Sequence, residues 1–277
     1  MRSSALPFFL ISFSSCGVLH AYGVTEKGRV RANNQDYFAV DEKLQLCVVA
    51  DGMGGHKAGE IASRLAVETL VEFLRDARHS QSSDRWPFGY DSSLSATGNR
   101  VRTAIHFANA QILEASNSID EYSGMGTTVV VAMVHDGLLS VGHVGDSRLY
   151  VLAHGRLRPL TRDDSWVAAV FDQDPALDPD VVRLHPMRNV LTNVVGTRPE
   201  TEVHVAEEPL GGSEILLLST DGVHGVLDDS WLEKLMTWTD DLRQMARGLV
   251  DAALTGGSRD NCTAVVARYT PDKRVQT

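Results

Sequence analysis

Cysteine is scarce in this chain of 277 residues, which contains only Cys16, Cys47 and Cys262. No two of them have the spacing of a metal site, and Cys47 and Cys262 lie in apolar runs that are typical of buried strands. Free thiols without a disulfide framework are typical of a reducing compartment. We therefore expect a cytoplasmic protein.

Basic residues and long apolar runs are also few. The 26 lysines and arginines are outnumbered by 36 acidic residues, which gives a formal net charge of −10. This charge disfavours nucleic acid and anionic membrane surfaces as main partners. After the N-terminal region, no segment approaches the ~20 apolar residues that a membrane-spanning helix needs, so we expect no stable membrane association.

The first residues of the chain carry a short apolar run, residues 5–11, after a single basic residue, Arg2. The run lacks an Ala-x-Ala cleavage site, so a leading strand or a non-native extension fits it better than an export signal. We assign residues 1–15 to this N-terminal extension, 16–271 to a single domain and 272–277 to a C-terminal tail.

Two common kinds of site are not indicated. The ten histidines show neither His-x-His nor His-Glu-x-x-His spacing, so a zinc site is not expected. Gly54-Gly55 lacks the Gly-Lys-Ser/Thr sequence of a nucleotide-binding loop, and a tight turn explains it better.

What the chain does contain is aspartate at the ends of apolar, strand-like runs. A carboxylate at the end of a buried strand is costly unless it is paired or holds a cation. Several such ends that converge form an oxygen-only site of the kind that hard divalent cations prefer. Singly, each aspartate also fits a helix cap or a turn, and Asp146 could pair with Arg148. The four positions are Asp51 after residues 44–50, Asp146 after 138–144, Asp221 after 214–219 and Asp260 before 261–269.

Apolar patterning predicts strands and helices in separate blocks. Helix pairs grouped between blocks of strands favour packed sheets with helices outside them, and not a doubly wound parallel sheet. Residues 175–186, with three prolines, are predicted to leave the sheet. The predicted strands are 44–50, 127–134, 138–144, 148–152, 156–160, 214–219 and 261–269, and the predicted helices are 57–77, 98–116 and 241–254.

Eight segments, taken in order along the chain, resemble the bacterial form of the metal-dependent Ser/Thr protein phosphatases of type 2C. They include Val-Ala-Asp-Gly-Met-Gly-Gly-His, Gly-Asp-Ser-Arg and Ser-Thr-Asp-Gly-Val. A single Asp-Gly carries no weight, but eight segments in the family's order do. The segments are residues 28–36, 49–56, 125–128, 142–148, 160–167, 188–192, 218–223 and 260–261.

The resemblance implies an α+β fold, an α-β-β-α sandwich of two packed, mainly antiparallel sheets flanked by helix pairs. It also implies two divalent metal ions, Mn²⁺ or Mg²⁺, at one end of the sheets. Arg31 matches the arginine that reaches the substrate phosphate. The implied ligands are Asp51 bridging both ions, Asp221 and Asp260 on the first, the Gly52 carbonyl and Asp36 on the second, and Asp146 on a third, weaker metal.

The implied reaction is hydrolysis of phosphoserine and phosphothreonine by in-line attack of a metal-bridging hydroxide. Two cations ~3.5–4 Å apart lower the pKa of a shared water, and Arg31 adds a planar charge toward the phosphoryl oxygens. Asp51 and Arg31 are therefore the expected catalytic residues. Expected partners are phosphoproteins and an opposing Ser/Thr kinase, and we expect a monomer. A non-catalytic regulatory or phospho-binding module on the same fold is the alternative.

Two departures from the family pattern concern the general acid and the flap, which we define as residues 163–188. Eukaryotic relatives carry a histidine directly after Asp-Gly as the general acid, whereas this chain has Met53, and the match does not give that role to His56. Bacterial relatives often read Asp-His-Ser where this chain has Asp163-Asp164-Ser165. The second departure predicts an altered charge in the flap and leaves the substrate preference open.

Overall fold

The structure, a computed structural model, describes residues 17–55, 57–79, 86–174, 176–178, 181 and 185–271. The expectations on residues 1–15, residues 272–277 and His56 lie outside these ranges, and the domain boundaries stay a prediction. Within the described ranges, no helix has the length and apolar character needed to cross a bilayer.

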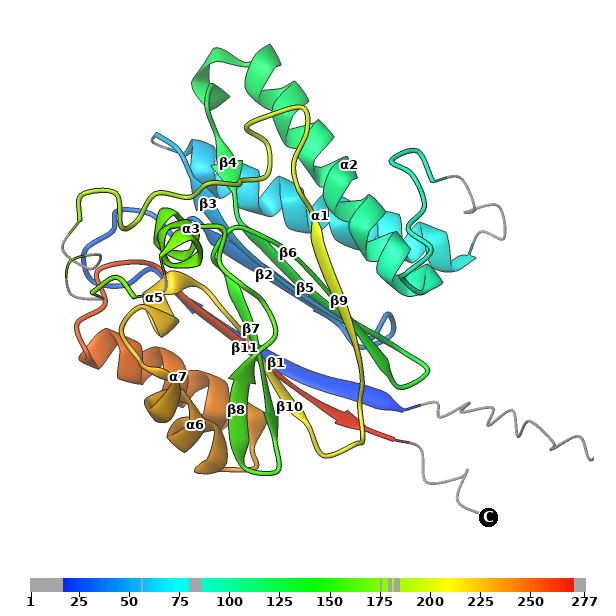
Figure 1. Cartoon of the computed structure of the whole chain (residues 1–277), viewed down its shortest axis with the longest axis vertical. Coiled ribbons are helices and arrows are strands. Elements are labelled where there is room, and N and C mark those ends of the chain that lie inside the picture. The colour runs from blue at the N-terminus through cyan, green and yellow to red at the C-terminus, as the bar shows by residue number, and fades with distance from the viewer. Residues whose placement is uncertain are drawn as a thin grey trace, which may run out of the picture.

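Two antiparallel sheets packed face to face form the centre of the molecule (Figure 1). One sheet has the strand order β1-β11-β10-β7-β8, and the other has the order β2-β3-β5-β6-β9 with the short β4 paired to β3. The strands are β1 (Val18–Glu26), β2 (Asp36–Asp41), β3 (Leu46–Met53), β4 (Gly126–Thr127), β5 (Val129–His135), β6 (Leu138–Val144), β7 (Arg148–Ala153), β8 (Arg156–Pro159), β9 (His204–Pro209), β10 (Ile215–Ser219) and β11 (Cys262–Thr270).

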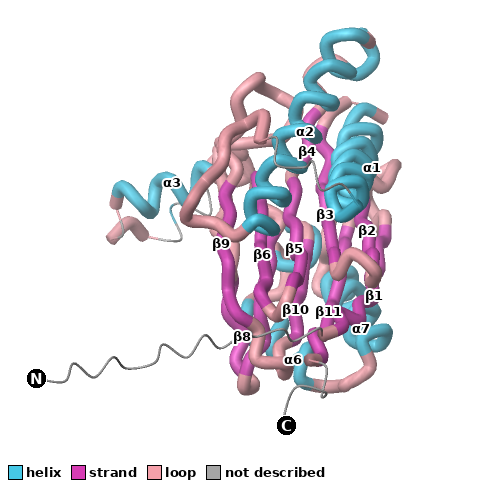
Figure 2. The backbone as a smooth tube through the Cα atoms, turned by 90° about the vertical axis from the view of Figure 1, so that its right-hand side faces the viewer, coloured by secondary structure: helices cyan, strands magenta, loops and turns pink. Residues whose placement is uncertain are grey.

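Helices cover both outer faces of the two sheets. Helices α1 and α2 pack on the sheet that contains β3, and α6 and α7 pack on the sheet that contains β11 (Figures 1 and 2). This arrangement confirms the α-β-β-α sandwich. The helices are α1 (Ala58–His79), α2 (Ala96–Ser118), the 3₁₀ helix η1 (Asp120–Tyr122), α3 (Trp166–Gln173), α5 (Asp221–His224), α6 (Asp229–Thr237) and α7 (Leu242–Thr255).

The core consists of three apolar layers, and β3 contributes to two of them. Val48 and Ala50 face α1 and α2, whereas Cys47 and Val49 face the other sheet. Successive side chains of a strand point to opposite faces of the sheet. The sequence of a strand that is buried on both faces is therefore continuously apolar. The third layer joins the second sheet to α6 and α7 and includes Leu249. These buried strands fix the positions of the aspartates at their ends.

Two tight hairpin turns connect neighbouring strands. Asp136 and Gly137 have φ values of 50° and 76°, and His154 and Gly155 have values of 52° and 74°. Two consecutive residues with positive φ give a turn whose twist matches that of the two antiparallel strands it joins. Asp-Gly is a preferred residue pair for such a turn. These turns join β5 to β6 and β7 to β8.

The structure also contains elements that the apolar pattern did not predict. Strands β1, β2 and β9 lie at sheet edges and are only partly buried, so they lack a continuous apolar run. Helix α3 belongs to the flap and has no buried residue, and α6 has a single pair of buried residues, Leu232 and Met236.

Candidate active site

Two aspartates face each other across the strands β2 and β3. Asp36 and Asp51 are partners in the antiparallel register. Asp36 is 5% exposed, and burial raises its pKa to about 7. Burial and, next, the charge of Asp36 raise the pKa of Asp51 well above its usual range. Because like charges directly opposite each other destabilise a sheet, this pair needs protons or a cation.

Two further carboxylates, those of Asp221 and Asp146, lie close enough to Asp51 for their charges to raise its pKa. Asp221 begins α5 directly after β10, and Asp146 lies in the turn between β6 and β7. Burial, followed by the charge of Asp260, raises the pKa of Asp221 to about 6. Burial, followed by the charge of Asp221, raises the pKa of Asp146 to about 7. The aspartates that the sequence places at strand ends therefore lie close to one another in the fold.

Two carboxylate oxygens of this group are buried without a protein partner among the described residues: Oδ1 of Asp36 and Oδ1 of Asp221. The other oxygen of Asp36 accepts from the Thr220 hydroxyl at 2.9 Å and from the Thr263 hydroxyl at 2.6 Å. A buried polar atom without a partner is costly. Oxygen donors of this kind fit a hard divalent cation.

Arg31 is bonded to one of the expected ligands. Its Nη2 donates to Asp260 Oδ2 at 2.5 Å, and this hydrogen bond is the main cause that raises the pKa of Arg31. Over the part of the chain that the structure describes, no three acidic, histidine or cysteine side chains form a ready-made metal cage. A cation bound at Asp260 would therefore have to compete with Arg31 for this carboxylate.

Asn261 holds the loop that carries Arg31. Its Oδ1 accepts from the backbone N–H of Gln35 at 2.8 Å, and its Nδ2 donates to the carbonyls of Lys27 and Asn33 at 2.9 and 3.0 Å. The loop between β1 and β2 is thereby fastened to the start of β11. The sequence placed Asn261 in a family segment but indicated no role for it.

Position 52 requires glycine because the backbone of α1 passes too close to leave room for a side chain. A Cβ at this position would lie 1.9 Å from the carbonyl oxygen of Gly59. The Gly52 N–H also donates to the Gln35 carbonyl at 3.0 Å. Only glycine permits such contact, so the residue expected to offer a carbonyl to the second metal is fixed between α1 and the Gln35 loop.

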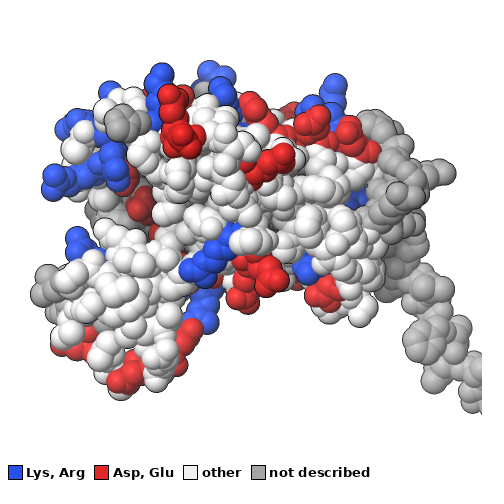
Figure 3. All heavy atoms as spheres, turned by 90° about the horizontal axis from the view of Figure 1, so that it is seen from above, with Lys and Arg blue, Asp and Glu red and all other residues white. Residues whose placement is uncertain are grey.

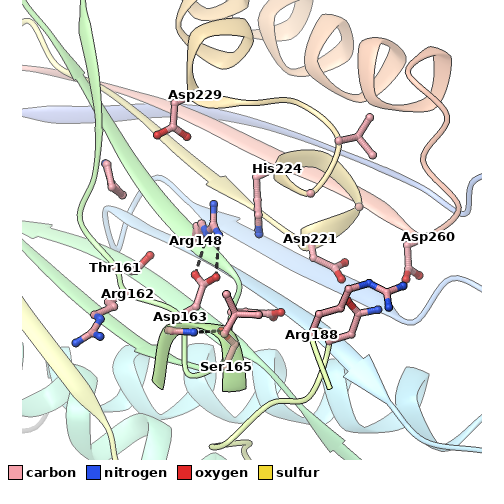
Figure 4. A pocket seen from close by; sticks show the side chains of 18 of the residues that line it. Arg148, Thr161, Arg162, Asp163, Ser165, Arg188, Asp221, His224, Asp229 and Asp260 are labelled. Atoms are coloured by element: carbon pink, nitrogen blue, oxygen red, sulfur yellow. Dashed lines mark hydrogen bonds and ion pairs between the residues drawn. The ribbon is translucent and has the colours of Figure 1, made fainter. Parts of the chain in front are cut away.

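Two cavities meet at these residues. A recess of about 270 Å³ is lined by each expected site residue except Asp36, which is buried beneath it. A larger cavity of about 830 Å³ shares three of these aspartates and extends below α3. In Figure 4, Arg188 lies beside the end that holds Asp221 and Asp260. The expected residues in the smaller recess are Arg31, Asp51, Gly52, Asp146, Asp221 and Asp260.

Arg148 pairs with Asp163, and not with Asp146. Its Nε and Nη2 donate to the two carboxylate oxygens of Asp163 at 2.8 and 2.7 Å, and its Nη1 donates to the Tyr150 hydroxyl at 3.0 Å (Figure 4). A bidentate pair of this kind satisfies the guanidinium. Asp146 is therefore not needed as the partner of Arg148.

Charges of both signs are distributed over the surface seen from above (Figure 3). Acidic side chains occur along this face, and the densest group of basic side chains lies at its left end. On this face the acidic excess of the composition forms no single patch.

Comparison with known proteins decides the family. The model of the protein phosphatase 2C family matches residues 25–255. This chain belongs to the protein phosphatase 2C family. The resemblance seen in the eight sequence segments is thereby confirmed.

Individual relatives of this family are similar over nearly the whole chain. The serine/threonine phosphatase stp of Listeria innocua is 30% identical over 255 residues, which are 90% of this chain and 95% of that protein. The structure of PppA, a key regulatory component of the T6SS in Pseudomonas aeruginosa, is 31% identical with a TM-score of 0.75 and covers 91% of this chain and 99% of its own.

One similar structure contains metal. The catalytic domain of the serine/threonine protein phosphatase PstP in complex with two manganese ions is 28% identical, with a TM-score of 0.77. The match covers 92% of this chain and 99% of that chain. The individual ligand assignments in our protein phosphatase 2C chain remain predictions.

Both aspartates at the start of the flap are largely buried and have polar partners. The Asp163 and Asp164 side chains are 19% and 14% exposed. Asp163 pairs with Arg148, and Asp164 Oδ1 lies 2.9 Å from His204 Nε2. The one acidic replacement in this segment of the protein phosphatase 2C chain, Asp164, thus has a polar partner.

Proposed function

We propose that this protein is a Mn²⁺- or Mg²⁺-dependent protein serine/threonine phosphatase. The observation that carries the proposal is the meeting of four aspartates at one recess, with Asp36 buried opposite Asp51 in the neighbouring strand. Buried oxygens of Asp36 and Asp221 have no partner among the described residues. Membership of the protein phosphatase 2C family and relatives named as serine/threonine phosphatases support it.

The family resemblance supports the following arrangement of the ions. Asp51, Asp221 and Asp260 would hold the first ion, and Asp51, the Gly52 carbonyl and Asp36 would serve the second. Asp146 would hold a third, weaker ion. Bound divalent cations lower the pKa of water to give a nucleophile and neutralise charge on the transferred phosphoryl group.

Side chains around the aspartates position the groups that would bind the metal and the substrate. Thr220 and Thr263 fix one oxygen of Asp36 and leave the other oxygen for a ligand. Arg31, half exposed and bonded to Asp260, can turn its guanidinium to the substrate phosphate once a cation takes over that carboxylate. A guanidinium binds two phosphate oxygens at once, which orients the phosphoryl group for in-line attack.

The larger cavity supports a phosphoprotein substrate. Its volume of about 830 Å³ exceeds what one phosphorylated side chain fills, and it continues below α3 from the aspartate cluster. Val167, Ala168 and Phe171 of α3 line it without being buried in the core. These apolar side chains offer contacts to residues that flank the phosphorylated one.

We also propose that the protein works as a monomer in the cytoplasm, opposite a Ser/Thr kinase. The free thiols of Cys47 and Cys262 are consistent with a reducing compartment. The net charge of −10 disfavours nucleic acid and anionic membranes as partners.

The test is phosphate release from a phosphothreonine peptide and a matched phosphoserine peptide, with and without Mn²⁺. We expect turnover of both peptides with Mn²⁺ and no turnover after dialysis against EDTA. A small aryl phosphate serves as the comparison substrate. Hydrolysis of the aryl phosphate alone would contradict the protein substrate, and full turnover without metal would contradict the metal centre.

A further inference from the structure

Asp164, which departs from the family's Asp-His-Ser pattern, binds both backbone groups of Gly145. The Gly145 N–H donates to Asp164 Oδ2 at 3.0 Å, and the Asp164 N–H donates to the Gly145 carbonyl at 2.9 Å. The Asp164 side chain is only 14% exposed. A carboxylate that accepts from a backbone N–H in such a position makes a strong, charge-assisted hydrogen bond.

Gly145 sets the conformation of the turn that carries Asp146. Its φ is +96°, and a Cβ there would lie 2.7 Å from Thr128 Cγ2, so the turn requires glycine at this position. Asp164 binds the same residue through its polar groups. The direction in which Asp146 leaves the turn therefore depends on Asp164.

Further hydrogen bonds hold the Asp164 carboxylate in place. Asn193 Nδ2 donates to Oδ2 at 2.8 Å, and His204 Nε2 lies 2.9 Å from Oδ1. The His204 ring stacks on His143 with 5.0 Å between centroids. Each carboxylate oxygen thus has a partner outside the turn, so the group has little freedom to move away from Gly145.

Asp164 also lies at the base of the flap. Its carbonyl accepts from the Thr192 N–H at 2.9 Å, and the next residue, Ser165, forms a β-bridge with Leu191. Ser165 caps α3 by accepting from the Ala168 N–H at 3.2 Å. Asp164 therefore joins the Asp146 turn to the start of the flap and to the segment that follows the flap.

We infer that Asp164 is a positioning residue for the metal site at Asp146, acting through the Gly145 N–H. The inference rests on the proposed function, because it takes Asp146 as a metal ligand. Residues that orient a ligand from behind typically change metal affinity about 10- to 100-fold when they are removed. The competing explanation is that Asp164 only stabilises the fold through its ion pair with His204.

The test is titration of Mn²⁺ into metal-free protein by calorimetry, for wild type, Asp164→Ala and Asp164→Asn. We expect Asp164→Ala to keep the two tight ions and to bind the weaker ion about 10- to 100-fold less tightly. Asp164→Asn keeps an oxygen that can accept from Gly145 and should lie in between. The matched control is Asp172→Asn, since Asp172 pairs with Arg162 in the same segment and should leave every Mn²⁺ affinity unchanged.

Turnover gives the second readout. The phosphopeptide activity that Asp164→Ala loses at low Mn²⁺ should return when the Mn²⁺ concentration is raised by the same factor as the affinity fell. Unchanged affinity for the weaker ion, with a melting temperature lowered as much as in His204→Ala, would overturn the inference. Loss of the two tight ions, or a wild type that binds no third ion, would also overturn it. Absence of phosphoester hydrolysis by a wild type that binds all three ions would instead refute the proposed function.

Discussion

Arg31 and Asp260, 229 positions apart in the sequence, are joined by a hydrogen bond of 2.5 Å between Nη2 and Oδ2. The residue expected to bind the substrate phosphate therefore neutralises a residue expected to bind metal. Asn261 holds the loop of Arg31 against the strand that follows Asp260, so the two stay neighbours in either state. With these expected roles, metal binding and phosphate binding would be linked through this pair.

Arg31→Ala should separate the two roles of this arginine. We expect kcat/KM on a phosphothreonine peptide to fall about 10²-fold, because a charged group aimed at the phosphoryl oxygens is lost. The same variant should bind Mn²⁺ at least as tightly as wild type in calorimetry, because Asp260 is no longer occupied by the guanidinium. Weaker Mn²⁺ binding would show that Arg31 organises the ligands and does not compete with the ions.

The metal-free protein should lose stability as the pH rises from about 4 to about 7. Burial raises the pKa of Asp36 and of Asp146 to about 7 from an ordinary value near 4, so the folded state binds more protons than the unfolded chain in this window. Each such group lowers the free energy of unfolding by about 1.4 kcal/mol per pH unit, and by less where the carboxylates titrate together.

The measurement is urea unfolding in EDTA at pH 5 and pH 8. Asp146→Asn, which cannot ionise, should be more stable than wild type at pH 8 and should show a smaller change between the two pH values. Added Mn²⁺ should restore wild-type stability at pH 8. A metal-free wild type that is more stable at pH 8 than at pH 5 would rule out this account of the buried carboxylates.

Gly52→Ala should disrupt the site by steric contact. The added Cβ would meet the Gly59 carbonyl at 1.9 Å, and backbone atoms must shift to relieve this. We expect a loss of about 3 kcal/mol or more of folding stability and loss of Mn²⁺ binding. Gly55→Ala is the matched control, because its Cβ meets nothing within 4 Å. Equal stability of the two variants in urea unfolding would show that α1 can shift to make room for the added methyl group.

Phe171→Ser should affect phosphopeptides and spare small substrates. Phe171 lines the larger cavity and is not buried in the core, so its removal takes apolar contact from a bound peptide and little from the fold. We expect KM for the phosphopeptide to rise about 5- to 50-fold, the effect of one buried apolar side chain, with an unchanged KM for an aryl phosphate. A parallel rise for both substrates would mean that the cavity does not hold flanking residues.

The central strands were predictable from the sequence and the edge strands were not. Within the predicted strands 44–50 and 214–219, residues 46–50 and 215–218 form continuous apolar runs because β3 and β10 are buried on both faces. In β9, three of the six residues are the polar His204, Glu207 and Glu208, and none of the six is fully buried, so the apolar signal is weak. Burial, and not strand formation itself, is what an apolar pattern reports.

Four of the five aspartates of the candidate site were predictable because they lie at one end of a strand-like run, whereas Asp36 was indicated only by the family resemblance. The partners of these residues were not predictable, since they come from distant segments. Examples are the hydroxyl of Thr263 on Asp36, the bond of Arg31 to Asp260, and the Asp164 carboxylate on Gly145. Such contacts depend on how the two sheets and the flap pack, which no local spacing encodes.

The most direct test of the central claim is Mn²⁺-dependent phosphate release from a phosphothreonine peptide by Asp51→Asn and Asp221→Ala, with circular dichroism as the folding control. Both residues line the recess where the aspartates meet. If this cluster is the catalytic centre, both variants keep the wild-type spectrum and lose turnover by at least about 10³-fold. Turnover near that of wild type in both folded variants would contradict the assignment of this cluster as the catalytic metal site.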